Sequence, residues 1–177
     1  IVATPTNGSL SSITSASATS ASVTYTPTAN YNGTDSFTYR ANDGLLNSDT
    51  ATVNITITAV NDAPMANGQS VSTTRNTAVA ITLTGSDVEG SALTFKIAST
   101  PTSGSLRDVS TTISTVPYTL SSAVVTYVPS ADFLGSDSFA FKVNDGTEDG
   151  PAATVSITVS APAPTGARHL PAVVGGR

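Results

Sequence analysis

Few residues in this chain of 177 could carry out catalytic chemistry. The chain has no cysteine, which excludes disulfides, thiolate metal ligands and cysteine nucleophiles. Its single histidine, His169, lies in a proline- and glycine-rich C-terminal stretch, where a histidine is usually solvated. No serine stands in a Gly-x-Ser-x-Gly sequence, and no phosphate-binding Gly-x4-Gly-Lys loop occurs. Acidic pairs such as Glu148 and Asp149 lie in turn-like sequence, so we predict that the protein is not an enzyme.

Aromatic side chains could instead form a sugar-binding face. Most of them lie in or beside segments where apolar and polar residues alternate, which favours packing in a core. Tyr31 and Tyr118 are the least committed to such segments. Two lysines, Lys96 and Lys142, also lie within alternating segments, but on the face opposite the apolar one, so we expect them to be exposed rather than crosslinked.

Charge and hydropathy exclude two classes of partner. Charged residues make up 11% of the chain and the net charge is −5, so a basic surface for nucleic acid is absent. No apolar run approaches the roughly 20 residues that cross a bilayer, and no secretory signal sequence is recognisable. We therefore expect neither nucleic-acid binding nor a membrane span.

A long internal repeat dominates the sequence. The segment YTPTANYNGTDSFTYRANDG (25–44) returns as YVPSADFLGSDSFAFKVNDG (127–146), an offset of 102 residues. The segments ATVNITI and ATVSITV show the same offset, whereas TPTNGSL and TPTSGSL are offset by 96, so the second copy has about six extra residues between Leu106 and Tyr127. A repeat of this length is a whole small domain rather than a solenoid turn.

Both copies alternate apolar and polar residues with a period of two, which predicts β-strands with one buried face. Turn sequences such as Asn-Asp-Gly separate these segments, and no segment has a helical period. Short strands joined by turns predict an all-β fold of antiparallel β-sandwiches. The alternating apolar residues are Phe37, Tyr39, Ala41, Val53, Ile55, Ile57, Val79, Ile81, Leu83, Leu93, Phe95, Ile97, Phe139, Phe141, Val143, Val155, Ile157 and Val159.

The two copies are unequal in length. Ile1 aligns with Ile97, so the first copy lacks a counterpart of residues 65–96, which include two predicted strands and most of a third. A sandwich without those strands would expose a hydrophobic groove and open sheet edges. We predict an incomplete repeat over 1–60, a complete repeat over 61–161 that begins in the linker AVNDAP (59–64), and a Pro/Gly-rich tail over 162–177.

The long motif of residues 25–44, followed by ATVNITITAVNDAP, resembles the bacterial cadherin-like and Ig-like tandem repeats of large secreted adhesins. The resemblance covers residues 1–161. It implies a tandem array of Ig-like or cadherin-like antiparallel β-sandwiches, the first one incomplete, located outside the cell or on its surface. It also implies modules that are not catalytic, that are joined head to tail and that often bind calcium at the joints.

The resemblance also implies which residues would bind calcium, an ion that takes about six to eight oxygen ligands. They come from an acidic loop (85–95), from the linker and from the Asn-Asp-Gly turns, and Ser91 replaces the usual third acid of the loop. The linker residue Asp62 would lie between the copies. The alternative is that Asp and Asn in these turns bind their own backbone. The implied ligands are Asp43, Asn61, Asp62, Asp87, Glu89 and Asp145.

Two functions from different classes follow. The first is an extracellular stalk or filament segment that assembles head to tail with its own copies or neighbouring repeats. In it, a donor strand completes the first repeat, and Leu170, Ala172 and Val174 in the tail alternate as such a strand requires. A piece of a longer repeat protein with the missing strands encoded upstream remains an alternative. The second function is an accessory module that binds cell-surface or matrix glycans for a larger secreted protein.

Overall fold

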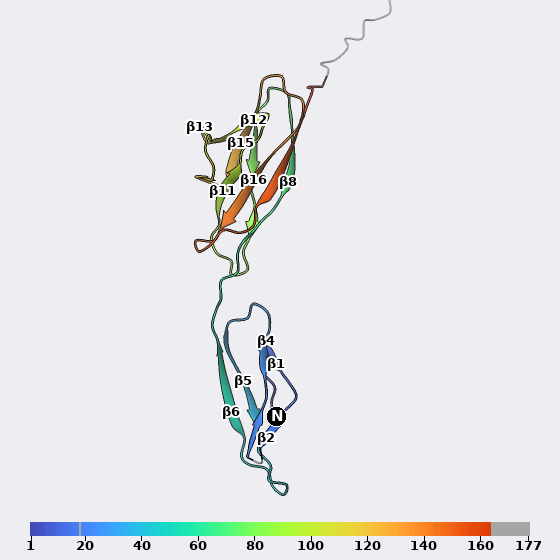
Figure 1. Cartoon of the computed structure of the whole chain (residues 1–177), viewed down its shortest axis with the longest axis vertical. Helices are drawn as coiled ribbons and strands as arrows, with labels where there is room; N and C mark the ends of the chain where they lie inside the picture. The colour runs from blue at the N-terminus through green and yellow to red at the C-terminus, as the bar shows by residue number, and fades with distance from the viewer. Residues whose placement is uncertain (18, 164–177) are drawn as a thin grey trace, which may run out of the picture. The chain divides into compact units, whose positions relative to one another are not determined.

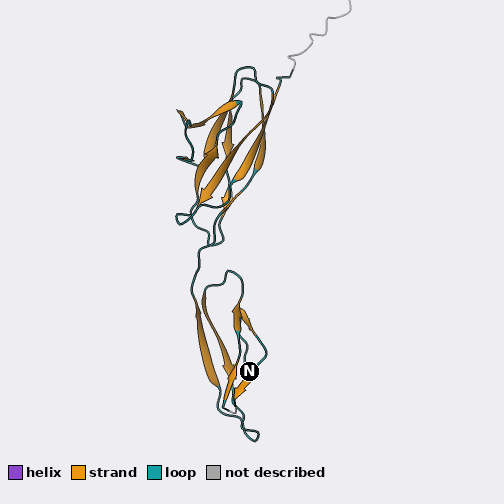
Figure 2. Ribbon diagram, viewed as in Figure 1, coloured by secondary structure: helices purple, strands orange, loops and turns teal. Residues whose placement is uncertain are grey.

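The computed structural model describes residues 1–17 and 19–163, and every regular element within them is a β-strand (Figure 2). The chain divides into two compact units, Ile1–Asn61 (unit 1) and Asp62–Arg177 (unit 2). Within the described part, the structure contains no helix of the length and hydropathy needed to cross a membrane. The prediction of an all-β fold is therefore confirmed.

Unit 2 is a two-layer sandwich built around one core (Figure 1). The first layer has the order β14 (Tyr118–Thr119), β11 (Thr94–Ser99), β16 (Gly135–Asn144), β17 (Ala153–Ser160) and β8 (Gln69–Thr74). The second has the order β13 (Thr111–Thr112), β12 (Gly104–Asp108), β15 (Val124–Pro129) and β9 (Val79–Thr82). A short ribbon of β7 (Met65–Ala66) and β10 (Gly85–Ser86) follows the linker. All pairs are antiparallel except β17 with β8, which is parallel.

The alternation predicted from the sequence is clear in β16 and β17 of this unit. In β17, Val155, Ile157 and Val159 are at most 2% exposed, while the residues between them face solvent. Side chains of both layers meet in a single apolar cluster, and burial of such surface is the main favourable term in folding. Its fully buried members include Leu83, Ile97, Leu106, Val125, Tyr127, Phe139, Phe141 and Val143.

Unit 1 consists of three antiparallel two-stranded ribbons. They are β1 (Gly8–Leu10) with β4 (Tyr25–Pro27), β2 (Thr14–Ser17) with β3 (Ser20–Ser22), and β5 (Gly33–Tyr39) with β6 (Ala51–Ile57). An isolated bridge joins Ala3 to Thr38, at the place where Ser99 pairs with Ala140 in unit 2. Unit 1 thus keeps the end of the β11 counterpart, and no residue aligns with β7 to β10.

Burial along the alternating face of unit 1 is uneven. Phe37 is buried, as expected, but Tyr39 is 41% exposed and Ala41 is also exposed. Their counterparts in unit 2, Phe141 and Val143, are fully buried because β11 pairs alongside them. The alternating apolar face is therefore buried at Phe37 but exposed at Tyr39 and Ala41, in line with the predicted exposure of apolar surface in the shorter copy.

The extra residues of the second repeat are fixed by one buried carboxylate. Asp108 accepts hydrogen bonds from the hydroxyl and the N–H of Ser121, at 2.6 and 2.8 Å, and from the Tyr118 hydroxyl at 3.3 Å. The Ser121 hydroxyl is the main cause that lowers the pKa of Asp108, against the opposing effect of burial. The stretch between β12 and β15, irregular in sequence, is in this way tied to the end of β12.

Replacing Val109 with Asn is expected to stabilise unit 2 by about 1 kcal/mol, because Val109 has a φ of 55°. A β-branched residue is strained in this left-handed region, whereas Asn adopts it more readily. The Val109 side chain is 81% exposed, so little packing is lost. Thermal unfolding measures the effect, with Val109→Ala as the control that keeps a Cβ in the same conformation. An unchanged or lower midpoint for Val109→Asn would contradict the prediction.

Candidate functional site

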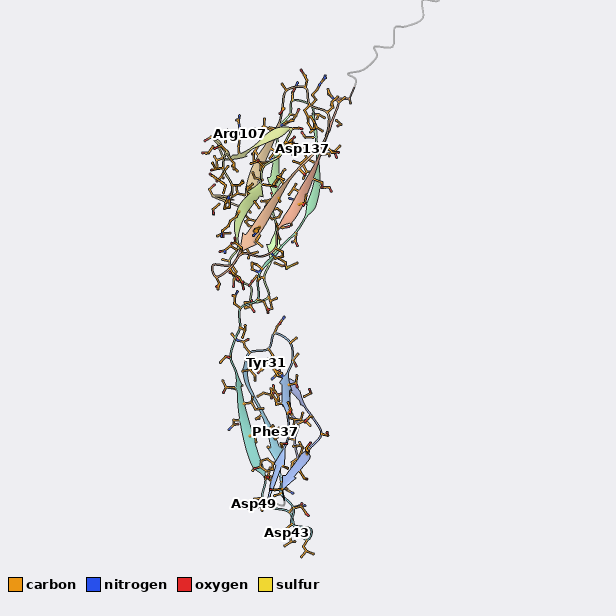
Figure 3. The ribbon with its side chains drawn as sticks, viewed as in Figure 1. Tyr31, Phe37, Asp43, Asp49, Arg107 and Asp137 are labelled. Atoms are coloured by element: carbon orange, nitrogen blue, oxygen red, sulfur yellow. The ribbon has the colours of Figure 1, made fainter. Side chains whose placement is uncertain are left out.

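A tyrosine and an aspartate form a hydrogen-bonded pair inside unit 2. The aspartate is Asp137, which lies near the start of β16 and is labelled in Figure 3. The Tyr127 hydroxyl donates to Oδ2 of Asp137 at 2.9 Å. The N–H of Ser103 donates to the same oxygen at 2.9 Å, and the N–H groups of Thr102 and Ser138 donate to Oδ1 at 3.0 and 2.9 Å. The Thr102 hydroxyl also donates to Oδ1 at 3.3 Å, so five donors from three segments of chain converge on one carboxylate that is only 7% exposed.

Unit 1 repeats this arrangement residue by residue. The Tyr25 hydroxyl donates to Oδ2 of Asp35 at 2.9 Å, and the N–H of Asn7 donates to it at 2.9 Å. The N–H groups of Thr6 and Ser36 donate to Oδ1 at 3.1 and 2.8 Å. The two tyrosine–aspartate pairs, Tyr25–Asp35 and Tyr127–Asp137, thus have the same hydrogen-bond partners in both copies of the module.

The sequence around each pair explains how it forms. Each tyrosine ring lies over the glycine of the Thr-Pro-Thr-x-Gly-Ser-Leu segment, Gly8 or Gly104. A Cβ on either glycine would lie 2.4 Å from a ring carbon, closer than real contacts allow. The glycine therefore lets the ring approach the loop whose N–H groups donate to the carboxylate.

Gly104→Ala is accordingly expected to destabilise unit 2 by about 2–3 kcal/mol, because the Tyr127 ring must move and loosen its bond to Asp137. Hydrogen exchange of the β17 amides reports the stability of this unit. Gly8→Ala is the matched control, since it makes the same clash with Tyr25 and should leave β17 unaffected. Equal exchange in Gly104→Ala and the unmodified chain would contradict the prediction.

The protonation states of the pairs are those of a structural site. Burial alone would raise the pKa of Asp35, but the N–H groups of Asn7, Ser36 and Thr6 donate to it and lower the pKa to about 2. Burial and the neighbouring carboxylate raise the pKa of Tyr25 to about 12. The pKa values of Asp137 and Tyr127 move in the same directions for the same reasons. Neither partner changes protonation near neutral pH, so the pairs do not resemble an acid–base couple.

Both aspartates were absent from the set of residues expected to form a site. The alternation of strand residues would have identified them, because Asp137 lies on the same face of its strand as Phe139 and Phe141. A carboxylate on an apolar face needs hydrogen-bond partners. A tyrosine ten residues earlier occurs in both copies, which is the second half of the signal.

The calcium ligands expected in unit 1 are not brought together. Asp43, labelled in Figure 3, lies in the turn before β6. Asn61 follows the other end of that strand, so the two residues lie at opposite ends of the unit. Oδ1 of Asp43 accepts hydrogen bonds from the N–H groups of Leu46 and Leu45, at 2.8 and 2.9 Å. These bonds lower its pKa. Asp43 thus lies at the end of unit 1 away from Asn61, and its role as a calcium ligand remains a prediction.

The four ligands expected in unit 2 lie at one end of the sandwich. The N–H of Asp62 donates to Oε2 of Glu89 at 3.3 Å, and the β7–β10 ribbon places Asp87 beside the linker. Asp145 lies in the turn after β16, where Gly150 contacts the Pro64 carbonyl. Oδ1 of Asp145 accepts from two N–H groups of its own turn. Oδ2 of Asp87 is buried and has no hydrogen-bond partner.

No group of three or more His, Cys, Asp or Glu side chains with metal-binding geometry occurs in residues 1–17 and 19–163. The calcium ligands therefore remain a prediction. The lysines expected to be exposed face each other across β11 and β16 and are half-buried. The Nζ of Lys96 forms an ion pair with Oδ1 of Asp149 at 2.5 Å, which, with a hydrogen bond from Asn144, lowers the pKa of Asp149.

The aromatic residues do not gather on the surface. All ten lie in the described part of the chain, and only Tyr39 is exposed by more than a third. Each tyrosine–aspartate pair borders an open polar hollow, lined in unit 2 by Thr102, Ser136, Asp137, Ser138, Ser156, Ile157 and Thr158. The aromatic residues of the described part of the chain thus form no cluster of exposed rings.

Unit 2 is a complete β-sandwich and unit 1 an incomplete copy of it with the same internal pair, an arrangement typical of tandem Ig-like repeats. A family model described as "Bacterial Ig domain" matches residues 1–56 and 61–158. The chain therefore belongs to the bacterial Ig domain family, which confirms the resemblance noted in its sequence and the fold class drawn from it.

Integrin beta-like protein A of Dictyostelium discoideum is 35% identical over 139 residues, covering 70% of this chain and 7% of that protein. The chain thus spans less than a tenth of the length of this curated relative. Among solved structures, human mucin-like protocadherin EC1-2 is similar with a TM-score of 0.47 and 16% identity, over 79% of this chain and 75% of that one. An endo-fucoidan hydrolase from glycoside hydrolase family 107 is similar with a TM-score of 0.40 and 24% identity, over 91% of this chain and 24% of that one.

Proposed function

We propose that the chain is a non-enzymatic structural and adhesion module, a stalk or filament segment outside the cell or on its surface. The observation that carries the proposal is the repeated tyrosine–aspartate pair, which fixes the same three segments in both units. A fully satisfied buried hydrogen-bond network makes each module rigid. Repeating a rigid module lengthens the protein without adding a reactive site. Membership of the bacterial Ig domain family and the 35% identity to an integrin beta-like protein support this proposal.

The proposal includes head-to-tail assembly, in which an added strand completes unit 1. Strand addition to an open sheet edge gives stable association, and a heterologous contact of this kind extends into a filament. The donor expected from the sequence is the tail, with Leu170, Ala172 and Val174. These residues lie outside the described part of the chain, so the donor remains a proposal.

Light scattering of the purified chain tests assembly. Large assemblies are expected for the full chain, and a variant without residues 165–177 should stay monomeric if the tail is the donor. A monomer at all concentrations would overturn self-assembly. Binding of the full chain to an array of surface glycans, in the monomeric state, would instead support the accessory binding module.

Calcium is part of the proposal only at the linker end of unit 2. The donors there suit a hard cation, since they are carboxylates and one of them, Oδ2 of Asp87, is a buried oxygen without a hydrogen-bond partner. The proposed ligands at this end are Asp62, Asp87, Glu89 and Asp145, with Asn61 preceding them in the linker.

Calcium is then expected to raise the free energy of unfolding of unit 2 by about 2.7 kcal/mol when its concentration is a hundred times Kd. The thermal midpoint of unit 2 should rise accordingly. Asp87→Asn should abolish this response. Asp43→Asn is the matched control, because Asp43 lies at the far end of unit 1 from the linker. A midpoint that is the same with calcium and with chelator would contradict the calcium proposal without affecting the proposal of a structural module.

A further inference from the structure

The outward face of the first layer of unit 2 is rich in hydroxyl groups. Neighbouring strands lie about 4.8 Å apart, and positions two residues apart along a strand lie about 6.8 Å apart, so side chains on such a face form a regular array. Two rows of exposed hydroxyl-bearing residues cross β16, β17 and β8 here, with Ser138, Ser156 and Ser70 in one row and Ser136, Thr158 and Ser72 in the next.

These six hydroxyls are free to bind a ligand. None of them donates or accepts a hydrogen bond within residues 1–17 and 19–163. Four of the residues surround the open polar hollow beside Asp137, which has a volume of about 400 Å³. A hydroxyl offers one donor and two acceptor positions, so the array suits a partner that is itself rich in hydroxyl groups.

The charges that the strands of this layer present outward are positive. Lys96, Lys142 and Asp137 are the charged residues of β14, β11, β16, β17 and β8, and Asp137 faces the core. Lys96 forms its ion pair with Asp149 of the adjoining turn. Lys142 is half-buried and forms no ion pair with a described residue. In a chain of net charge −5, this layer therefore presents a cation without an ion-pair partner and no outward-facing acid on its strands.

We propose that the outward face of β16, β17 and β8 binds an extended acidic glycan. A carboxylate or sulfate group of the glycan lies at Lys142, and sugar hydroxyls bond to the free hydroxyls of Ser138 and Ser156. Lys142 and Ser138 are four residues apart in β16, so the ligand extends over about 13 Å. This inference goes beyond the proposed function, because a stalk needs no ligand on this face.

Unit 1 carries the same residue types at the matching positions, which favours a polymer over a small molecule. Arg40 stands at the position of Lys142. A second open hollow borders Asp35, and its lining includes Thr34, Ser36, Asn54 and Thr56. A polymer that occupies like sites in several modules is held more tightly than any one site would hold it.

Nucleic acid is another class of anionic polymer, and this face does not suit it. Proteins that bind single strands combine a basic groove with aromatic side chains on which the bases stack. Here Lys142 is the cation without an ion pair on the strands of the face, and Tyr39 of unit 1 is the aromatic residue exposed by more than a third in the described part of the chain. Rows of hydroxyls match the hydroxyls of sugars better than they match bases.

Amide NMR spectra of the full chain at low ionic strength test the inference with four probes. They are hexagalacturonate, a sulfated heparin hexasaccharide, neutral maltohexaose and single-stranded DNA. At least one of the two acidic hexamers is expected to shift the amides of β16 and β17 with a Kd on the order of mM. Binding by one hexamer and not the other identifies the acidic group. Maltohexaose should bind about fivefold more weakly, because it lacks the charge that pairs with Lys142.

Two pairs of variants supply matched controls. Lys142→Gln is expected to weaken binding of the acidic hexamer about fivefold, whereas Arg107→Gln removes an exposed charge from the other layer and should have no effect (Figure 3). Ser156→Ala should weaken binding about threefold, and Thr126→Ala, on the outward face of the other layer, should not.

Three results would overturn the inference. They are an absence of shifts at β16 and β17 with either acidic hexamer, binding of single-stranded DNA as tight as that of the hexamers, and equal binding by Lys142→Gln and Arg107→Gln. Each of them leaves the proposed stalk function standing, because assembly is measured separately by light scattering.

Discussion

Asp137→Ala is expected to lower the free energy of unfolding of unit 2 by roughly 3–5 kcal/mol. The substitution leaves three N–H groups and the hydroxyls of Tyr127 and Thr102 without their acceptor, in a place where the carboxylate is 7% exposed. A buried donor that loses its partner costs about 1–3 kcal/mol, and water reaches only some of the five. Hydrogen exchange at the slowest β17 amides measures the loss directly.

Three controls isolate the role of the carboxylate. Tyr127→Phe removes one donor and leaves the others bonded, so a loss of about 1–2 kcal/mol is expected. Ser136→Ala changes an exposed residue of the same strand and should stay within about 0.5 kcal/mol. Asp35→Ala should destabilise unit 1 and leave β17 unchanged. A loss below about 1 kcal/mol for Asp137→Ala would show that the pair does not support the fold.

The strands of unit 2 were predictable because both layers are present. Each inward residue of β16 and β17 meets a partner across the core, so polarity and burial agree along the strand. The same pattern does not bring burial at Tyr39 and Ala41 of unit 1. Alternation states which face a side chain occupies, but burial requires a second surface, and the strand that provides it in unit 2 has no counterpart there.

The tyrosine–aspartate pairs were missed because Asp in a Gly-x-Asp-Ser sequence has the composition of a turn. The strand β16 in fact begins at Gly135, two residues earlier, which turns the aspartate into an inward-facing strand residue. The donors that satisfy it come from the loop at Thr102 and Ser103, 35 and 34 residues away in sequence. Contacts of that range depend on how the two layers pack, which a local pattern does not specify.

The position of Asp43 within unit 1 could have been derived from the order of the strands. Successive turns of an antiparallel ribbon lie at alternate ends, so the turn that joins β5 to β6 lies opposite the linker that leaves β6. In unit 2, Asp62, Asp87 and Glu89 do lie near one another, because the linker and the loop after β10 are at the same end of that unit. The side-chain geometry of a metal site needs finer information than topology gives.

Acid is expected to destabilise both units progressively below about pH 4. An aspartate in an unfolded chain has a pKa of about 3.9, whereas the pKa of Asp35 in the folded unit is about 2. The folded state therefore binds this proton less tightly, and the stability that the carboxylate contributes is complete above about pH 4 and is lost as pH falls through about 2. The pKa values of Asp137 and Asp108 are also lowered, so unit 2 loses stability in the same direction.

The raised pKa values of the paired tyrosines make the folded state lose stability at alkaline pH. The pKa of Tyr25 is raised to about 12 from its ordinary value of about 10, so its contribution is complete below about pH 10 and is lost as pH rises through about 12. Hydrogen exchange of β6 amides across this range, corrected for the intrinsic rate, should show a plateau with two falling limbs. Tyr25→Phe should remove most of the alkaline limb and keep the acid one, because Asp35 retains its three N–H donors. An acid limb that also disappears in Tyr25→Phe would mean that the phenol, and not the backbone, holds the carboxylate in its ionised form.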